Sequence, residues 1–211
     1  MESEDLKKIL DTAEALFRKY GIRSVTMADI ARDLGMSKKT LYLHVENKRD
    51  LIDKTLQRHI VDEKGQCLNI IETASDALEE LLHMSIYIQK MIQDMNPSLI
   101  FDLKKYHRPI WEKLERYEKE FVFSIVKENL KRGIKEGLYR ANLNAEIVSR
   151  IYIGTFPMFS DDELFPFNQF PRSELHKAFV RYHINGIVSE EGRKLLDAYL
   201  RAYTEKNENL L

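Results

Sequence analysis

Side chains that can bind phosphate or the edges of nucleobases lie close together near the N-terminus. They are Ser37, Lys38, Lys39, Thr40, Tyr42, His44 and Lys48. Hydroxyl, ammonium, phenol and imidazole groups donate hydrogen bonds, and an ammonium group also carries the positive charge that attracts phosphate. Between Arg18 and Arg58 there are ten Lys and Arg residues but only five Asp and Glu, although the whole chain has a net charge of -1. This local excess of positive charge favours an anionic partner for the segment.

Two short helices joined by a glycine turn are predicted to hold these groups. Thr26 and Asp29 have the spacing of a capping box, in which each side chain bonds the backbone N–H of the other residue. The first helix, over 27–34, would end at Gly35, because glycine adopts the left-handed conformation without steric cost. Ser37 would then cap the second helix of the pair.

The apolar residues Leu41 and Val45 fall on the core side of the second helix, so Tyr42 and His44 cannot both point inward. We expect at least one of these polar rings to face solvent, where it can bond a phosphate. Two short helices with this spacing predict a helix-turn-helix, whose second helix lies in the DNA major groove. The same spacing also occurs in helical bundles, in which the lysines would form a solvated surface and Tyr42 would be an interface aromatic.

The run from Thr26 to Leu51, TMADIARDLGMSKKTLYLHVENKRDL, resembles the DNA-binding domain of the TetR (tetracycline repressor) family. The resemblance covers roughly residues 6–60. The residues that it implies to be phosphate contacts are Thr26, Tyr42, His44 and Lys48, and those that it implies to lie near base edges or phosphates are Lys38, Lys39 and Thr40. Val45 departs from the family pattern, because an aromatic residue usually occupies its position.

The rest of the chain is also predicted to be helical. Apolar spacing predicts further helices over 6–20, 48–64, 78–95, 110–130, 144–156, 173–188 and 190–203. The pair Asn96-Pro97 would end the helix over 78–95, because proline excludes the helical conformation of the residue before it. We therefore expect an all-α fold. It would consist of an N-terminal three-helix helix-turn-helix DNA-binding domain over 1–50, a connecting helix over about 48–64, and a larger helical effector-binding and dimerisation domain over 65–211.

Aromatic residues are concentrated in the larger domain, where 15 of the 21 lie between Phe101 and Tyr182. They can fill the core and the dimer interface, or they can line a cavity for a bulky, mainly apolar or aromatic effector. The residues predicted to line such a cavity are Met91, Met95, Trp111, Tyr117, Phe121, Tyr152 and Phe156. Few charged residues lie on these apolar stripes, so a carboxylate ligand would have little to pair with.

Two further segments of the larger domain carry hypotheses of their own. Phe159–Phe170 has four phenylalanines in an acidic loop that prolines interrupt. We expect it to fold over the partner subunit, over the mouth of the cavity or into a local core. The basic segment Lys104–Arg108 directly precedes Pro109, and it is either a solvated loop or a hinge that relays ligand binding to the helix over 48–64.

The sequence lacks the usual signatures of catalysis and of cofactor binding. It has no glycine-rich phosphate loop, no Gly-x-Ser-x-Gly and no His-Glu-x-x-His. Cys67 is the single cysteine, so one chain can build neither a disulfide nor a multi-cysteine zinc site. We therefore expect no enzymatic activity, no metal and no cofactor.

These features predict a ligand-responsive transcriptional regulator, with repression as the default. It would bind a near-palindromic operator in double-stranded DNA as a homodimer and be released by a small-molecule effector. The alternative is a helical protein-binding adaptor without DNA binding. The opening residues lack the features of a signal peptide, and no apolar run approaches the length of a membrane span, so we expect a cytoplasmic protein without a membrane partner.

Overall fold

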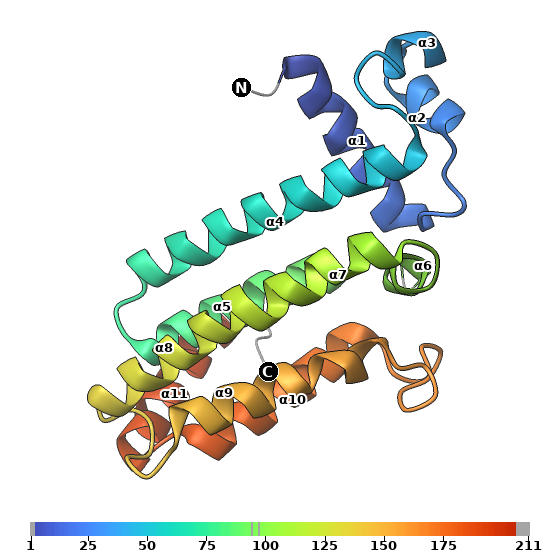
Figure 1. The fold of residues 1–211 in the computed structure, drawn as a ribbon. Helices are drawn as coiled ribbons and strands as arrows, with labels where there is room; N and C mark the ends of the chain where they lie inside the picture. The colour runs from blue at the N-terminus through green and yellow to red at the C-terminus, as the bar shows by residue number, and fades with distance from the viewer. Residues whose placement is uncertain (1–2, 94, 97, 206–211) are drawn as a thin grey trace. The chain divides into compact units, whose positions relative to one another are not determined.

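The computed structural model describes residues 3–93, 95–96 and 98–205. These residues form helices and turns, without a strand beyond one isolated bridge between Tyr139 and Val188. The elements, labelled in Figure 1, are α1 (Glu4–Tyr20), α2 (Met27–Asp33), α3 (Lys38–Leu41), α4 (Lys48–Thr73), α5 (Ala77–Gln93), α6 (Ser98–Tyr106), α7 (Arg108–Tyr117), the π-helix η1 (Glu118–Val122), α8 (Phe123–Lys135), α9 (Ala145–Gly154), the 3-10 helix η2 (Phe156–Ser160), α10 (Arg172–Ile187) and α11 (Glu190–Glu205). The predicted all-α fold is confirmed.

The chain divides into two compact units. Unit 1 comprises residues 1–65 and 94–116, and unit 2 comprises residues 66–93 and 117–211. The long helix α4 contributes to both units, because it continues to Thr73, well beyond the expected end near residue 64. The boundary placed at residue 65 from the sequence remains a prediction, but the segment 94–116 belongs with the N-terminal residues in unit 1.

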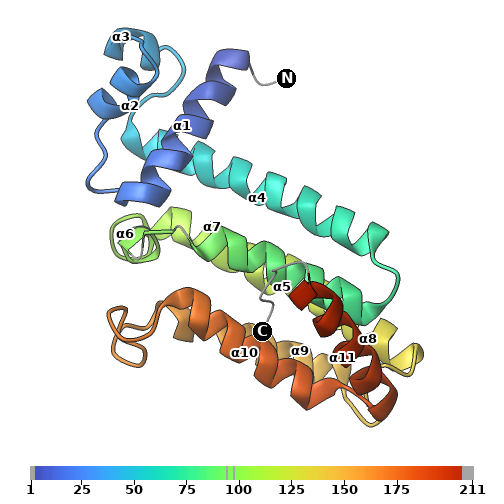
Figure 2. The ribbon, with the colours of Figure 1, turned by 180° about the vertical axis from the view of Figure 1, so that it is seen from behind.

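The core of unit 1 is built from the apolar faces of its helices. Figures 1 and 2 show α1, α2 and α3 gathered around the N-terminal end of α4. The stripe predicted on α1 is buried, and the residues concerned are Ile9, Leu10, Ala13 and Phe17. The buried residues of α2 and α3 are Met27, Ile30, Ala31 and Leu41. Burial of these side chains is the main source of stability for two helices this short, because short helices are marginal in water.

Helix α6 is a second contribution to unit 1, and the sequence interpretation missed it. Asp102 and Leu103 of this helix are buried, and the Asp102 carboxylate accepts a hydrogen bond from the Arg23 backbone N–H at 3.1 Å. The backbone N–H of Asn96 also donates to the Arg18 carbonyl at 2.6 Å. These bonds hold the start of the 95–116 segment against the C-terminal end of α1. The preceding helix α5 ends at Gln93, and Pro97, the expected helix stop, lies outside the described residues.

Unit 2 is a bundle in which α8 packs against α5 and α9, and α10 packs against α5. The largest buried residues of its core include Leu78, Leu82, Leu130, Tyr139 and Ile184. The long helix expected over 110–130 is present as a continuous helical run, but the π-helical turn η1 interrupts its α-helical hydrogen bonding between α7 and α8. Helices α9 and α11 begin where predicted, since Asn144 and Ser189 cap their N-termini through side-chain oxygens.

Candidate nucleic-acid interface and ligand cavity

The two helices of the predicted helix-turn-helix are held by local hydrogen bonds. The Asp29 backbone N–H donates to the Thr26 hydroxyl at 3.2 Å, and the Thr26 N–H donates to the Asp29 carboxylate at 2.9 Å, which completes the predicted capping box. Gly35 has a φ of +65° in the turn between the helices. The Ser37 hydroxyl accepts the Thr40 backbone N–H at 3.1 Å and so caps α3.

The second helix of the pair presents its polar residues to solvent. Ser37, Lys38, Lys39 and Thr40 are all exposed. Leu41 and Val45 anchor the same segment in the core, with 0% and 2% of their surfaces exposed. One polar ring turns outward as predicted, because Tyr42 is 47% exposed and His44 is half-buried. Leu43 is 76% exposed and adds an apolar group to this surface, of the kind that contacts a thymine methyl. The α-helix itself ends at Leu41, so Val45 lies beyond it.

The ammonium group of Lys48, a predicted phosphate contact, already has a partner within unit 1. It donates to the Ile22 carbonyl at 2.5 Å. Burial lowers the pKa of Lys48, although the charges of Asp102 and Asp29 act in the opposite direction. Nothing in the sequence indicated this contact, because it joins residues that are 26 positions apart. The phosphate contact implied for Lys48 remains a prediction, and it would add to a structural role.

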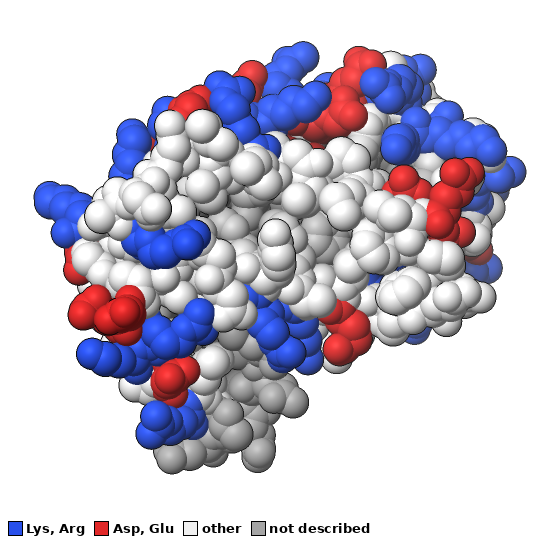
Figure 3. Space-filling model, turned by 90° about the horizontal axis from the view of Figure 1, so that it is seen from below, with Lys and Arg blue, Asp and Glu red and all other residues white. Residues whose placement is uncertain are grey.

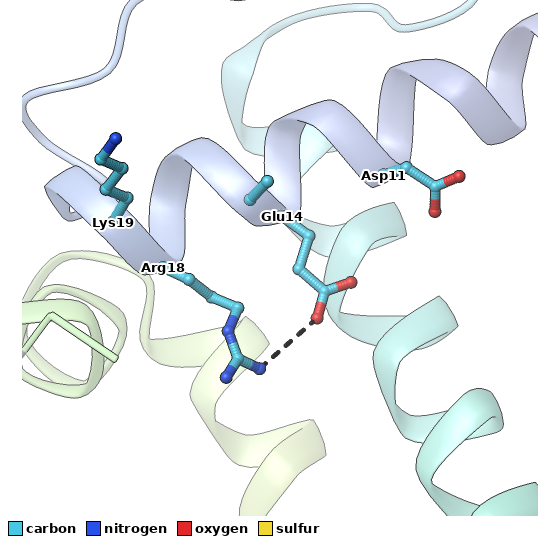
Figure 4. Close-up of a pocket in the computed structure, with 5 residues that line it drawn as sticks. Asp11, Glu14, Arg18 and Lys19 are labelled. Atoms are coloured by element: carbon cyan, nitrogen blue, oxygen red, sulfur yellow. Dashed lines mark ion pairs between the residues drawn. The ribbon is translucent and has the colours of Figure 1, made fainter. Parts of the chain in front are cut away.

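A shallow polar groove runs along α1 on the side of Arg18 and Glu14, which form an ion pair at 4.0 Å (Figure 4). Asp11 and Lys19 also line this groove. Its acidic and basic side chains balance one another, so it does not favour either an anion or a cation. Glu14 also accepts a hydrogen bond from His59 of α4 at 3.0 Å, which ties α1 to α4.

A small, partly open cavity of about 50 Å³ lies within unit 2, which is room for one or two water molecules and below the range of small-molecule sites. The apolar residues that line it are Leu81, Met84, Ile88, Ile125, Val126 and Val180, and the polar or aromatic ones are Glu80, Ser85, Asn129, Tyr152 and His183. They come from α5, α8, α9 and α10. The sequence interpretation missed Glu80, Ser85, Asn129 and His183.

The polar end of this cavity belongs to a buried hydrogen-bond network. Glu80 is 3% exposed and its carboxylate accepts from Arg132 at 3.1 Å. Burial raises the pKa of Glu80, while Asn129 and Arg132 oppose that change. Asn129 donates to the Ala77 carbonyl at 2.8 Å, and its amide oxygen lies 3.0 Å from the Tyr139 hydroxyl. Such a network fixes the orientation of its members, because an unsatisfied buried polar group is costly.

The seven residues predicted to line an effector cavity are divided between the two units, and their common role as a cavity lining remains a prediction. Tyr152 lines the cavity of unit 2, and Phe156 packs edge-on against it with ring centroids 5.7 Å apart. Tyr117 and Phe121 stack on one another at 5.4 Å. Trp111 instead lies in the hydrophobic core of unit 1. The other two, Met91 and Met95, are half-buried and fall in units 2 and 1 respectively.

The phenylalanine-rich segment 159–170 packs, in part, on its own chain. Phe159 contacts Phe179 of α10 edge-on at 5.5 Å, and Phe165 contacts Phe170 in the same way at 5.6 Å. The Arg172 guanidinium lies 3.7 Å from the centre of the Phe167 ring, an arrangement that is favourable for a cation. These contacts favour the interpretation that the segment forms a local core within its own chain. That it folds over the partner subunit or over the mouth of a cavity remains a prediction.

The described residues contain no group of three or more His, Cys, Asp or Glu side chains placed to hold a metal ion. Among the same residues, no helix has both the length and the apolar character needed to cross a bilayer.

Comparison with known proteins identifies the family. The family described as "Bacterial regulatory proteins, tetR family" matches residues 9–55. The Uncharacterized HTH-type transcriptional regulator YvaF of Bacillus subtilis is 31% identical over 186 residues, which cover 88% of this chain and 96% of that protein. The HTH-type transcriptional repressor KstR2 of Mycobacterium tuberculosis is 24% identical over 161 residues, covering 68% and 73% of the two chains. A TetR-family regulator from Agrobacterium tumefaciens has a similar fold, with a TM-score of 0.70 at 18% identity over 87% of this chain and 97% of that one.

These relatives are named as transcriptional regulators and not as enzymes, and none of them favours the adaptor alternative. The helix-turn-helix lies within the matched segment 9–55. The chain belongs to the TetR family of bacterial regulatory proteins and is a DNA-binding transcriptional regulator.

Proposed function

We propose that this regulator is a homodimeric repressor that binds a near-palindromic operator and leaves it when a small molecule binds among the helices of unit 2 and widens the small cavity there. The observation that carries the proposal is the exposed end of α3. Ser37, Lys38, Lys39 and Thr40 reach solvent there, while Leu41 and Val45 anchor the segment in the core. Thr26, Tyr42, His44 and Lys48 complete the proposed contact surface. The relative KstR2 is named as a transcriptional repressor, which supports repression over activation.

The experiment that tests DNA contact compares lysines in two places. We would measure binding of the double variant Lys38→Gln and Lys39→Gln to a fluorescent duplex taken from the DNA beside its own gene. If both lysines meet phosphates, the slope of log affinity against log salt should fall in magnitude by about 1.8, because each contact contributes about 0.9. Lys194→Gln removes an exposed charge from α11 and serves as the control. An unchanged slope for the double variant would refute the assignment.

An exposed apolar surface in unit 2 supports the dimer. Ile147 and Ile151 of α9 are 55% and 63% exposed, and Tyr182 of α10 is 81% exposed. Figure 3, which views the molecule from below Figure 1, shows charged side chains mostly around the edge of a broad uncharged area. Large exposed apolar surfaces mark interaction sites in soluble proteins. Light scattering should give twice the chain mass of 24.9 kDa, and Ile151→Asp should halve the measured mass. A wild-type chain that stays monomeric would contradict the proposal.

A continuous helical run supports the link between cavity and DNA. It begins with α7 in unit 1, passes through the π-helical turn η1 and ends as α8, which contributes Ile125, Val126 and Asn129 to the cavity. Within unit 1, Lys113 of α7 pairs with Asp53 of α4 at 2.6 Å. We propose that ligand in the cavity shifts this run and, through the Lys113–Asp53 pair, moves α4.

The hinge hypothesis for Lys104–Arg108 fits the same scheme. The Arg23 guanidinium donates to the Tyr106 hydroxyl at 3.1 Å, so the end of α6 is bonded to the segment that precedes α2. Lys113→Gln should weaken the release of DNA by ligand while leaving affinity for ligand-free DNA near the wild-type value. Pro109→Ala tests the hinge itself. Unchanged ligand-linked release in both variants would exclude this route of coupling.

A further inference from the structure

Unit 1 carries a second group of exposed positive charges, outside the helix-turn-helix. Lys104 and Lys105 lie in the last turn of α6, and Arg23 lies in the loop between α1 and α2. All three are exposed. Within the part of the chain that the structure describes, none of the three forms an ion pair with a carboxylate. Their charges are therefore available to an anionic partner.

Two aromatic rings of α6 hold two of these charges in place. The Arg23 guanidinium lies 4.6 Å from the centre of the Tyr106 ring and donates to its hydroxyl at 3.1 Å. The Lys105 ammonium group lies 5.0 Å from the centre of the Phe101 ring and 5.5 Å from that of Tyr106. A ring attracts a cation without neutralising its charge. These contacts therefore restrict the positions of the cations and leave them able to bind an anion.

The loop between α1 and α2 connects this group to the phosphate contacts proposed above. The Arg23 N–H donates to the Asp102 carboxylate of α6 at 3.1 Å, and the Ile22 carbonyl accepts the Lys48 ammonium group of α4. The loop therefore contacts both α6 and the start of α4, and it ends at Thr26. Figures 1 and 2 show α6 beside the C-terminal end of α1, where this loop begins.

The neighbouring side chains leave the charge of this corner positive. His107 directly follows α6, and burial lowers its pKa, with the charges of Lys48 and Arg49 lowering it further and only Asp102 acting in the opposite direction. The nearby carboxylates of Glu112 and Asp53 are already paired, with Arg108 at 3.0 Å and with Lys113 at 2.6 Å respectively. Phosphate is therefore the kind of group that this corner favours.

We propose that Arg23, Lys104 and Lys105 form a second phosphate-binding surface, which contacts the DNA backbone outside the segment that α3 reads. This inference rests on the proposed binding of an operator. It goes beyond that binding because α6 lies outside the helix-turn-helix and outside the segment 9–55 that matches the family. Contacts to phosphate add affinity and fix the position of the protein on the duplex, but they do not read the base sequence.

The test measures how the affinity for DNA depends on salt. The full-length double variant Lys104→Gln and Lys105→Gln is titrated by fluorescence anisotropy against a duplex taken from beside its own gene. The slope of log affinity against log salt should fall in magnitude by about 1.8 for each bound chain, because each phosphate contact contributes about 0.9. Arg23→Gln should lower it by about 0.9 for the same reason. An unchanged slope in either variant would contradict the proposal.

Two further variants separate the contact from net charge and from folding. The double variant Lys135→Gln and Lys194→Gln removes two exposed charges from unit 2 and should leave the slope near its wild-type value. The variant Lys104→Arg and Lys105→Arg keeps both charges and should keep the slope. Fluorescence of Trp111, in the core of unit 1, verifies that each variant is folded.

A scrambled duplex distinguishes a phosphate contact from recognition of bases. The glutamine variants should lose affinity for the operator and for the scrambled duplex by the same factor, because both have the same backbone. A loss confined to the operator would overturn the assignment to phosphate. If the wild type shows a steep slope and the Lys104 and Lys105 variant matches the unit 2 control, the second surface is wrong and operator binding stands. If wild-type affinity does not depend on salt, both are wrong.

Discussion

Replacing Thr26 with alanine separates two roles that the structure and the family give to one hydroxyl group. In the free protein, this hydroxyl accepts the Asp29 N–H at 3.2 Å and bonds the Asp29 carboxylate at 2.7 Å. Loss of a threonine N-cap costs about 1 kcal/mol of unfolding free energy. Helix α2 should remain in place, because Met27, Ile30 and Ala31 stay buried in the core. With a urea m value of about 2 kcal/mol/M, the unfolding midpoint of Thr26→Ala should fall by roughly 0.5 M.

Tryptophan fluorescence measures this change directly, because Trp111 is the single tryptophan and is 8% exposed in the core of unit 1. Operator affinity is measured separately on folded protein and should fall by about tenfold if the hydroxyl also bonds a phosphate. Thr26→Ser keeps the hydroxyl and should preserve both stability and affinity. The reasoning is refuted if the midpoint of Thr26→Ala is unchanged, or if the serine variant loses as much affinity as the alanine variant.

Two further predictions concern stability. Burial opposes the charged form of His59, but Glu14 and Glu63 outweigh it and raise its pKa above 6.5. The stabilisation that the charged His59 provides is therefore complete below about pH 6.5, and it disappears as the pH rises through the raised pKa. His59→Gln should for this reason lower the free energy of unfolding, measured in urea, less at about pH 9 than at about pH 6. An equal cost at both values would contradict this. Gly133→Ala should destabilise by about 1–3 kcal/mol, because the new methyl group would meet the Tyr139 ring. Gly65→Ala, with open space around it, should not destabilise, and equal midpoints for these two alanine variants would count against the packing argument.

Local signals in the sequence were sufficient to predict the helix-turn-helix. The capping box of Thr26 and Asp29, the turn at Gly35 and the cap at Ser37 all involve residues within a few positions of one another. Such features depend on neighbouring backbone groups, and the sequence shows them directly. The buried stripe of α1 was predicted for the same reason, because helical periodicity identifies which face is apolar.

Features that depend on distant residues were not predictable in this way. Periodicity indicated that Trp111 lies on an apolar face, but it did not show that this face packs in unit 1. Helix α6 was missed because its burial depends on α1 and on the Arg23 N–H, 79 positions from Asp102. Glu80 was missed as a cavity residue because its partner Arg132 is 52 positions away. A carboxylate is buried only when such a partner is present, and no local pattern reveals the partner.

On the proposed function, α3 and its neighbours read operator DNA from a dimer. The most direct measurement is anisotropy of a duplex carrying the inverted repeat beside the gene, titrated with protein between about 50 and 200 mM salt, with a scrambled duplex as competitor. We predict two chains per duplex, a steep loss of affinity across this range and clear preference for the repeat. Affinity that is independent of salt, or equal for the repeat and the scrambled duplex, would contradict the account.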